Sequence, residues 1–290
     1  MDSLVKENLI SSYQTDGGFI VHGVGMLDKL YRGLGIDPKT SLDRKVYELE
    51  GLTHFFYHDV MALALKLGIT KEDHVLSLGE GNGAPSRLLV KRFGCRVTGI
   101  DINPAQIAKA RDCAALHGVQ GNVDYHLQNV EDFDLPAKDF TTAFVNETCG
   151  HWQRKDKAFK RIYLHLRQGA KIGFNAWLKG DKGSLNEAYD LIPEFKGLYK
   201  NGIWFQDDLN TYKRLLEEAG FKILEMYDCT DKLDIKMRAR LKAAPQWDMY
   251  GKIMGYKAQK SGFNYYAAML KTHYDFLRYA VITAQKFSGT

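Results

Sequence analysis

Short apolar runs alternate with helical patterns through most of the chain from Asp73 onward. Brief runs rich in Val, Ile, Leu and Phe predict buried strands, whereas apolar residues three and four apart predict amphipathic helices. The predicted strands of this part cover residues 74–79, 95–101, 123–127, 140–146 and 170–177. The predicted helices cover residues 85–93, 104–117 and 155–166. Such alternation is typical of an α/β fold with a doubly wound parallel sheet.

The pattern changes after the fifth predicted strand. A predicted helix over residues 207–219 ends at Gly220, and the alternating run 221–227 predicts a sixth strand. The apolar run 276–286 predicts a seventh strand. Because no helix-length crossover of the usual kind directly precedes this run, we expect the last strand to enter the sheet antiparallel.

Three segments lie outside this alternation. Residues 1–70 are predicted to form an N-terminal helical cap, and residues 71–290 to form the main α/β domain. Within that domain, residues 178–206 and 229–273 are predicted insertions. Insertions at these places can act as helical lids over a site at the carboxyl ends of the strands.

Composition and charge exclude several classes of protein. Hydrophobic residues make up 45% and charged residues 26% of the chain, and no apolar run approaches the roughly 20 residues of a membrane helix. The mixed charge of the N-terminus argues against a secretory signal, so we expect a cytoplasmic protein with no integral membrane segment. The net charge is +5, but the Lys and Arg residues are interleaved with Asp and Glu through most of the chain, so no nucleic-acid partner is expected.

The cysteine and histidine residues do not predict a metal site. The four cysteines are scattered without a Cys-x-x-Cys pair, which indicates reduced thiols. His54 and His58 are four residues apart on a predicted helix, but no third ligand is evident. We therefore expect no bound metal.

A glycine-rich turn, Leu78-Gly79-Glu80-Gly81-Asn82-Gly83, joins the first predicted strand to its helix. Glycine allows the backbone to approach a ligand closely, and NAD, FAD and adenosylmethionine enzymes all use such a turn. Asp101 ends the second predicted strand, where its carboxylate can accept both hydroxyls of an adenosine ribose. The glycine spacing is one residue tighter than the dinucleotide pattern.

The spacing Gly79-x-Gly81-x-Gly83 resembles the first motif of class I S-adenosylmethionine-dependent methyltransferases. This resemblance implies S-adenosyl-L-methionine as the cofactor and a Rossmann-like fold of seven strands with the last one antiparallel. Gln128-Asn129-Val130 stands where this class usually has an acid followed by a small residue that hold the adenine. Asn129 departs from the usual Asp, but an amide oxygen can still accept a hydrogen bond from the adenine amino group.

Three stretches are similar to particular C-methyltransferases. The stretch from Gly79 to Arg87 resembles sterol C-methyltransferases, although Ser77 stands where many members carry Asp. The stretch from Asn146 to Trp152 resembles both the sterol enzymes and geranyl diphosphate C-methyltransferases, and His22-Gly23-Val24-Gly25 resembles the latter group. The resemblance also implies that Tyr13 closes over the cofactor. The implied cofactor residues are Tyr13, His22, Gly79, Gly81, Gly83, Asp101, Ile102, Gln106, Asn129, Val130 and Asn146.

Two residues after the fourth predicted strand are candidates for acid–base chemistry. Methylation of an alkene carbon leaves a carbocation, and the Glu147 carboxylate can stabilise that cation and then accept its proton. Alternatively, Glu147 binds the amino group of methionine or caps the following helix. His151 can act as a base toward a hydroxyl, amine or thiol, and its alternative is a structural role beside Trp152.

The added segments are rich in aromatic residues, which either line a cation-binding cavity or form the core under a lid. These residues are Phe55, Phe56, Tyr57, Trp204, Phe205, Tyr250, Tyr256, Phe263, Tyr265 and Tyr266.

The sequence therefore predicts a methyltransferase of a small-molecule substrate, with C-methylation of an isoprenoid alkene as the leading reaction. The first alternative is N-, O- or S-methylation of a small polar metabolite. The second is a non-catalytic adenosylmethionine-binding module. The sequence leaves the oligomeric state open, a homo-oligomer included.

Overall fold

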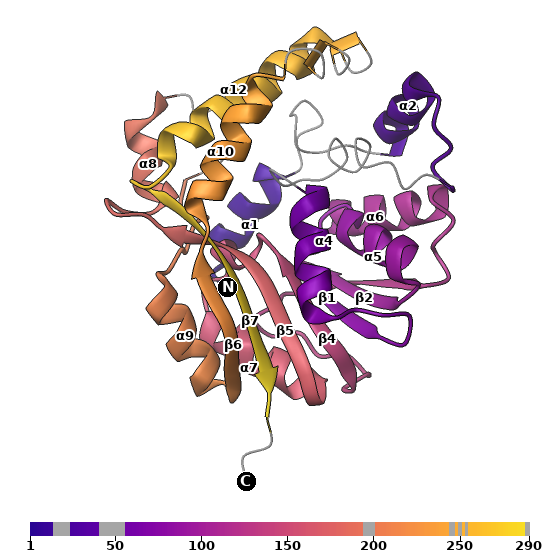
Figure 1. Ribbon diagram of the computed structural model, residues 1–290, viewed down its shortest axis with the longest axis vertical. Helices are drawn as coiled ribbons and strands as arrows, with labels where there is room; N and C mark the ends of the chain where they lie inside the picture. The colour runs from indigo at the N-terminus through magenta and orange to yellow at the C-terminus, as the bar shows by residue number, and fades with distance from the viewer. Residues whose placement is uncertain are drawn as a thin grey trace.

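A central sheet with helices on both faces organises the chain (Figure 1). The structure is a computed structural model, and it describes residues 1–13, 24–40, 56–193, 201–243, 247–248, 251–252 and 255–287. His22, His54, Phe55 and Tyr250, which the sequence singled out, lie outside the described residues.

Seven strands form the sheet in the order β3-β2-β1-β4-β5-β7-β6. The first five are parallel, whereas β7 lies between β5 and β6 and is antiparallel to both. The predicted seven-stranded sheet with an antiparallel last strand is therefore confirmed. The strands are β1 (His74–Leu78), β2 (Arg96–Asp101), β3 (Val123–Leu127), β4 (Phe140–Asn146), β5 (Leu166–Lys179), β6 (Phe221–Asp228) and β7 (Leu277–Lys286).

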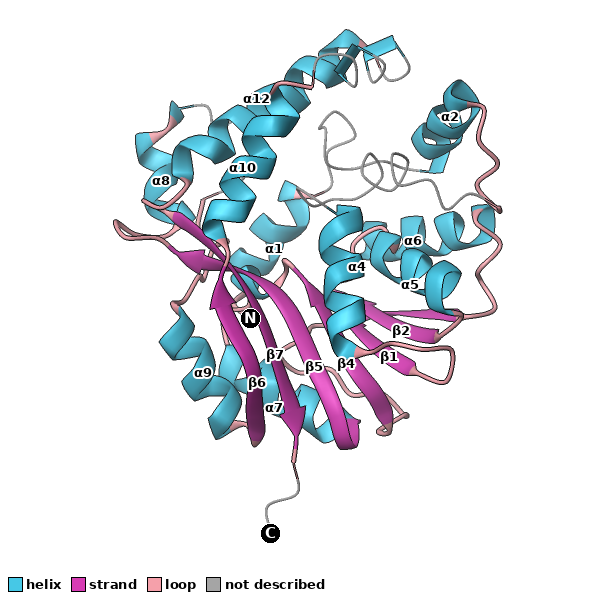
Figure 2. Cartoon of the chain, viewed as in Figure 1, coloured by secondary structure: helices cyan, strands magenta, loops and turns pink. Residues whose placement is uncertain are grey.

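The helices cover the sheet in two layers (Figure 2). Helices α4, α5 and α6 pack on one face, and α7 and α9 pack on the other. The helices are α1 (Ser3–Ser12), α2 (Val24–Leu34), α4 (Phe56–Leu67), α5 (Ala84–Phe93), α6 (Pro104–Leu116), η1 (Cys149–His151, a 3-10 turn), α7 (Lys155–His165), α8 (Leu185–Leu191), α9 (Leu209–Glu218), α10 (Thr230–Leu241) and α12 (Tyr256–Thr272).

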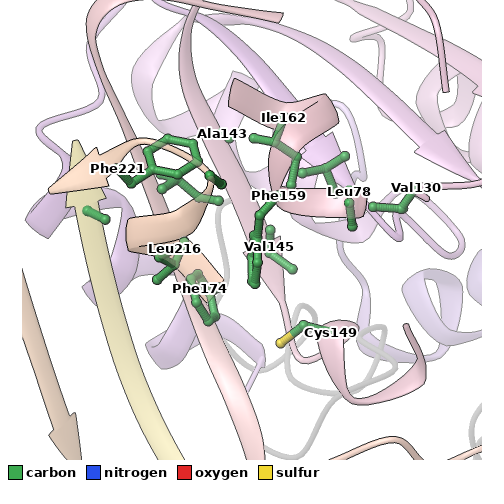
Figure 3. Packing of buried hydrophobic residues seen from close by; sticks show 14 of the residues in the cluster. Leu78, Val130, Ala143, Val145, Cys149, Phe159, Ile162, Phe174, Leu216 and Phe221 are labelled. Carbon is green, nitrogen blue, oxygen red and sulfur yellow. The ribbon is translucent and has the colours of Figure 1, made fainter. Parts of the chain in front are cut away.

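The burial of each strand explains its sequence pattern. Strand β4 is central and covered on both faces, so all but one of its residues are buried and its sequence contains no charged residue. Strand β6 is an edge strand with mixed burial, and its sequence mixes apolar with charged residues. Part of the core between the sheet and α7 and α9 appears in Figure 3, where the rings of Phe159 (α7) and Phe174 (β5) lie 5.7 Å apart between centroids.

Strand β5 is longer than the sequence predicted, since it begins at Leu166 and ends at Lys179 rather than covering 170–177. Strand β7 pairs with β5 continuously from Lys171 to Lys179, and Leu166 pairs with β4 beyond an irregularity in the register. The polar residues at both ends of β5 were not recognised as strand because their hydrogen-bond partners are distant in the sequence.

The added segments gather at the carboxyl ends of the parallel strands. Helices α1, α10 and α12 lie at this end of the sheet (Figure 1). None of the helices in the described ranges combines the length and hydropathy needed to cross a bilayer. The division into residues 1–70 and 71–290 stays a prediction.

Candidate active site

The glycine-rich turn leaves the end of β1 with three left-handed residues, since φ is 73° at Gly79, 59° at Gly81 and 79° at Gly83. The N–H of Gly79 donates to the Ile100 carbonyl at 2.9 Å, which ties the turn to β2. A Cβ atom on Gly79 would lie 2.5 Å from the Thr148 side chain. Glycine is therefore required here by the protein's own packing as well as by its backbone conformation.

Asp101 connects the turn to the end of β2. Its Oδ2 accepts a hydrogen bond from the Gly81 N–H and its Oδ1 from the Asn103 N–H, each at 2.8 Å. Burial raises the pKa of Asp101 above its usual value, against these two backbone hydrogen bonds. Each carboxylate oxygen still has a lone pair that no backbone N–H uses, so the two oxygens can accept hydrogen bonds from two ribose hydroxyls.

Glu80, inside the turn, was not predicted as part of the site. Its Oε1 accepts hydrogen bonds from the backbone N–H and the hydroxyl of Ser86, and the Ser86 hydroxyl lies 2.7 Å from the Tyr125 hydroxyl. Burial raises the pKa of Glu80 to about 7. Its position as a charged residue between two glycines could have indicated a role in the site. Through these contacts Glu80 holds the turn to α5.

A cavity lies between this turn, the ends of β2, β3 and β4, and helix α1. Its volume is about 1060 Å³, and part of this space is open to solvent. Nine of the predicted cofactor residues line it, namely Tyr13, Gly79, Gly81, Asp101, Ile102, Gln106, Asn129, Val130 and Asn146. Gly83 is not among the lining residues. A Cβ atom there would lie 2.6 Å from the Tyr125 hydroxyl, so it supports the turn from behind.

Further residues line the cavity that the sequence did not single out. They are Met1, Leu9, Glu80, Asn82, Pro85, Asn103, Thr148, Trp152 and Trp177. Leu9 belongs to α1, and Trp177 lies near the end of β5. Leu9 reaches the cavity because α1 packs over the sheet, and Trp177 reaches it from β5, so two segments far apart in the sequence supply these apolar side chains.

Among the buried polar atoms at the cavity that lack a hydrogen-bond partner within the described residues, two belong to amide side chains. The first is Oε1 of Gln106, whose amide nitrogen donates to the Tyr13 carbonyl at 2.9 Å. The second is Nδ2 of Asn146, whose oxygen accepts from the Asn175 amide at 2.9 Å. An acceptor and a donor left over in this way fit a polar ligand, because buried polar groups are normally paired.

Asn129 and Val130 lie at the end of the cavity beyond β3. The Asn129 Oδ1 accepts a hydrogen bond from the Glu131 N–H at 3.1 Å, which orients the side chain. One lone pair of that oxygen remains for a donor such as an adenine amino group. Val130 is 7% exposed and provides an apolar surface for a base.

Glu147 directly follows β4 and has a strained backbone, with φ at 60°. Its N–H donates to the Asn175 carbonyl at 3.1 Å, and its Oε1 accepts a hydrogen bond from the Tyr279 hydroxyl at 2.8 Å. Its side chain lines the cavity although the residue is only 8% exposed. Thr148, rather than Glu147, occupies the N-cap of η1, so the contacts do not favour a helix-capping role.

Both ring nitrogens of His151 have partners. Nδ1 lies 2.9 Å from the Ile203 carbonyl, which can only accept, so Nδ1 carries the proton and Nε2 accepts from the Tyr13 hydroxyl at 2.9 Å. Burial lowers the pKa of His151 to about 4. A weakly basic ring with both nitrogens engaged does not favour the predicted role as a base, which stays a prediction.

Two indoles form an aromatic wall of the cavity. The rings of Trp177 and Trp204 are stacked, with centroids 5.3 Å apart and planes at 10°, and the His151 ring lies 4.3 Å from Trp204. The other predicted aromatic residues are divided: Tyr266 is buried against Trp247, whereas Tyr256 and Phe263 are exposed. Trp204 alone among those described with side chains lines the cavity.

No group of three His, Cys, Asp or Glu side chains in the described ranges is arranged to hold a metal ion. The four cysteines are free thiols.

Comparison with known proteins gives a consistent result. A family model for a methyltransferase domain matches residues 75–169. The ubiquinone/menaquinone biosynthesis C-methyltransferase UbiE of Hydrogenovibrio crunogenus is 32% identical, over 67% of this chain and 89% of its own. The sterol 24-C-methyltransferase ERG6 of Saccharomyces cerevisiae is 27% identical over 59% of this chain. The match spans 45% of the length of ERG6.

Solved structures share the fold at low sequence identity. The geranyl diphosphate C-methyltransferase of Streptomyces coelicolor, solved with Mg²⁺, geranyl-S-thiolodiphosphate and S-adenosyl-L-homocysteine, has a TM-score of 0.68 and 16% identity, and the match covers 97% of this chain and 98% of that one. Phosphoethanolamine N-methyltransferase 2 of Haemonchus contortus has a TM-score of 0.70 and 18% identity, with 91% and 61% covered. The resemblance read from the sequence motifs is confirmed.

Proposed function

The chain belongs to the class I S-adenosylmethionine-dependent methyltransferases, and we propose that it methylates a carbon atom of an isoprenoid alkene, either a prenyl diphosphate or a sterol-like olefin. The observation that carries this proposal is the Glu147 carboxylate, which lines the same cavity as the indoles of Trp177 and Trp204. The names of the sterol and geranyl diphosphate enzymes among its relatives support it.

The residues of the cavity fit the cofactor, S-adenosyl-L-methionine. When bound, this cofactor supplies an electrophilic methyl group on a positively charged sulfur. Asp101 would accept the ribose hydroxyls, and Asn129 with Val130 would hold the adenine. The unpaired polar atoms of Gln106 and Asn146 would bind the remaining polar groups.

Glu147 performs the step that distinguishes carbon from most other acceptors. The π electrons of the alkene would form the new bond to the methyl carbon while the bond from that carbon to the cofactor sulfur breaks and leaves its electron pair on sulfur, so the substrate becomes a carbocation. The Glu147 carboxylate stabilises this cation by its charge and then accepts a proton from the adjacent carbon, so that the C–H electrons restore a double bond. The faces of Trp177 and Trp204 add about 0.5 to 2 kcal/mol per ring through cation–π contact.

Helix α1 and Tyr13 exclude water from this cation. The Gln106 side chain holds the Tyr13 carbonyl, and the His151 ring holds the Tyr13 hydroxyl. In this proposal His151 positions Tyr13 and takes no proton from the substrate. Water exclusion matters because a carbocation open to solvent would be captured as an alcohol.

The test is a product analysis. The protein is incubated with methyl-labelled cofactor and a panel of prenyl diphosphates, sterol-like olefins, amines, phenols and thiols, and each product is examined by NMR. We expect a new carbon–carbon bond in the product of an olefin. A labelled methyl group found only on nitrogen, oxygen or sulfur would contradict the proposal.

A second candidate is methylation of a small amine. The same carboxylate and indoles would also attract an ammonium group before it loses its proton, and the Haemonchus contortus enzyme by its name acts on such a substrate. The amine arm of the panel tests this candidate. Tight cofactor binding without turnover on any arm would instead favour the non-catalytic module.

A further inference from the structure

Behind Glu147, a row of polar side chains leads away from the cavity. We propose that Tyr279 and Asp59 carry the proton received by Glu147 to solvent beside Lys236. This inference rests on the proposed function, because it assigns a route to the proton that the reaction releases. It concerns three residues from β7, α4 and α10 that line no part of the cavity.

The contacts join these residues in sequence. The Tyr279 hydroxyl donates to Glu147 Oε1 at 2.8 Å. It also interacts electrostatically with the Asp59 carboxyl group, whose Oδ2 has no hydrogen-bond partner within the described residues. Asp59 Oδ1 in turn accepts a hydrogen bond from the Lys236 ammonium at 3.0 Å. The Tyr279 hydroxyl therefore stands between two carboxyl groups, one at the cavity and one toward the surface.

Exposure increases along the row beyond the tyrosine. Tyr279 is 3% exposed, the Asp59 side chain 12% and the Lys236 side chain 39%. A proton at Asp59 can therefore reach water, whereas Glu147 faces the cavity that cofactor and substrate would fill.

The charges around Asp59 suit a group that gains and loses a proton near neutral pH. The pKa of Asp59 is raised to about 6, since the effect of burial outweighs the opposing charge of Lys236, and the negative charge of Glu147 contributes to the rise. Tyr279 lowers it as well, and Cys229 also faces this carboxyl group. The pKa of Tyr279 itself lies well above its usual value, mainly through burial, so Tyr279 stays a neutral hydroxyl that both donates and accepts.

The transfer balances without any further reactant. Protonated Glu147 gives its proton to the Tyr279 oxygen while Tyr279 gives its own proton to Asp59. The Glu147 carboxylate is restored and Tyr279 remains a phenol. Asp59 then releases the proton to water, and the Lys236 charge favours that release because it stabilises the Asp59 carboxylate. In this role Tyr279 and Asp59 are positioning and relay residues that do not touch the substrate.

The kinetic test is the pH profile of kcat on the substrate that the product analysis identifies. Wild-type kcat should fall as the pH drops through about 6, because protonated Asp59 cannot accept a second proton. D59N and Y279F should each lower kcat about tenfold, and D59N should lose this acid limb. D59E should restore part of the rate. K236Q should move the acid limb to higher pH, since Lys236 holds the pKa of Asp59 down.

Two matched controls separate the relay from general effects on stability. K66Q removes another ion pair of α4, the one between Lys66 and Glu225, and should leave the acid limb in place. Y212F removes the hydroxyl of another buried tyrosine, which interacts with Cys149, and should keep kcat within about twofold. A D59N protein with wild-type kcat and an unchanged acid limb would overturn the relay.

A spectroscopic test needs neither cofactor nor substrate. Infrared spectra of the cofactor-free protein should show a carboxylic-acid band that titrates near pH 6 and is absent from D59N. The midpoint of this band should fall in E147Q, because the two carboxyl groups interact. A midpoint that E147Q does not move would overturn the relay even if D59N is too unstable for kinetics. The proposed function is tested separately by the product analysis, and it fails if the methyl group is found only on nitrogen, oxygen or sulfur.

Discussion

The two sides of the cavity are built in different ways. The cofactor side uses the turn at residues 79–83, Asp101 and Asn129. Each lies at or just after the end of a strand and is hydrogen-bonded to backbone groups of these strand ends. The acceptor side uses Glu147, Trp177, Trp204 and Tyr13, and Tyr279 holds Glu147 from outside the cavity. The first side consists mainly of local backbone geometry, and the second of side chains brought together from distant segments.

This difference has a consequence for function. Backbone groups at strand ends are set by the sheet itself, so we expect the cofactor side to be the part of the cavity that proteins with this sheet have in common. The acceptor side depends on the added helices and on β7, and there the specificity of this protein is expected to lie. Substitutions on the two sides should therefore change different kinetic constants.

The largest effect is expected from E147Q. Glutamine keeps the shape of the side chain but cannot accept a proton or balance a cation, so kcat should fall by about 10² to 10⁴-fold. Cofactor affinity, measured by calorimetry, should change little, since Glu147 lies on the acceptor side. A large loss of cofactor affinity with unchanged kcat would instead assign Glu147 to the methionine amino group.

The next largest effect is expected from D101A, which should change cofactor affinity rather than kcat. Loss of charge-assisted hydrogen bonds to the ribose should weaken cofactor binding by about 10- to 100-fold. At saturating cofactor, kcat should remain close to the wild-type value. The measurement is the cofactor Kd with kcat on the same preparation, and D124N, a substitution of an exposed aspartate on β3, serves as the control. Equal losses in both constants would mean that the two sides are not separable.

A smaller effect is expected from the link between Tyr13 and His151. Y13F removes one hydrogen bond and should raise the KM of the substrate about threefold to tenfold. H151F should have a similar effect, and the double variant should be no worse than either single variant, because both remove the same contact. Additive losses would contradict the positioning role and favour an independent role for His151.

The smallest effect concerns stability and pH. The pKa of His151 is lowered to about 4 by burial, whereas an unfolded histidine titrates near 6.5. Between these values the unfolded chain binds the extra proton, so this histidine makes the free energy of unfolding decrease as the pH falls from about 6.5 to 4. H151F should reduce that dependence in denaturant titrations at several pH values. An identical dependence in wild type and variant would contradict the burial of a neutral ring.

The sequence by itself determined the fold class and most of the cofactor side. Apolar runs alternating with amphipathic helices predict a doubly wound sheet, and the glycine spacing with Asp101 marks the carboxyl ends of β1 and β2. These features can be recognised in the sequence because their residues form short contiguous motifs or repeat with the period of a strand or helix. Even there, the full length of β5 depends on its pairing with β7.

Only the tertiary structure decided the acceptor side. It placed Trp177 beside Trp204, occupied both nitrogens of His151, and set Tyr279 between Glu147 and Asp59. No periodicity or spacing links residues 59, 147 and 279, because their contact follows from strand order and from the packing of α4 against the sheet. Such contacts depend on the whole folded chain, and a linear pattern does not record them.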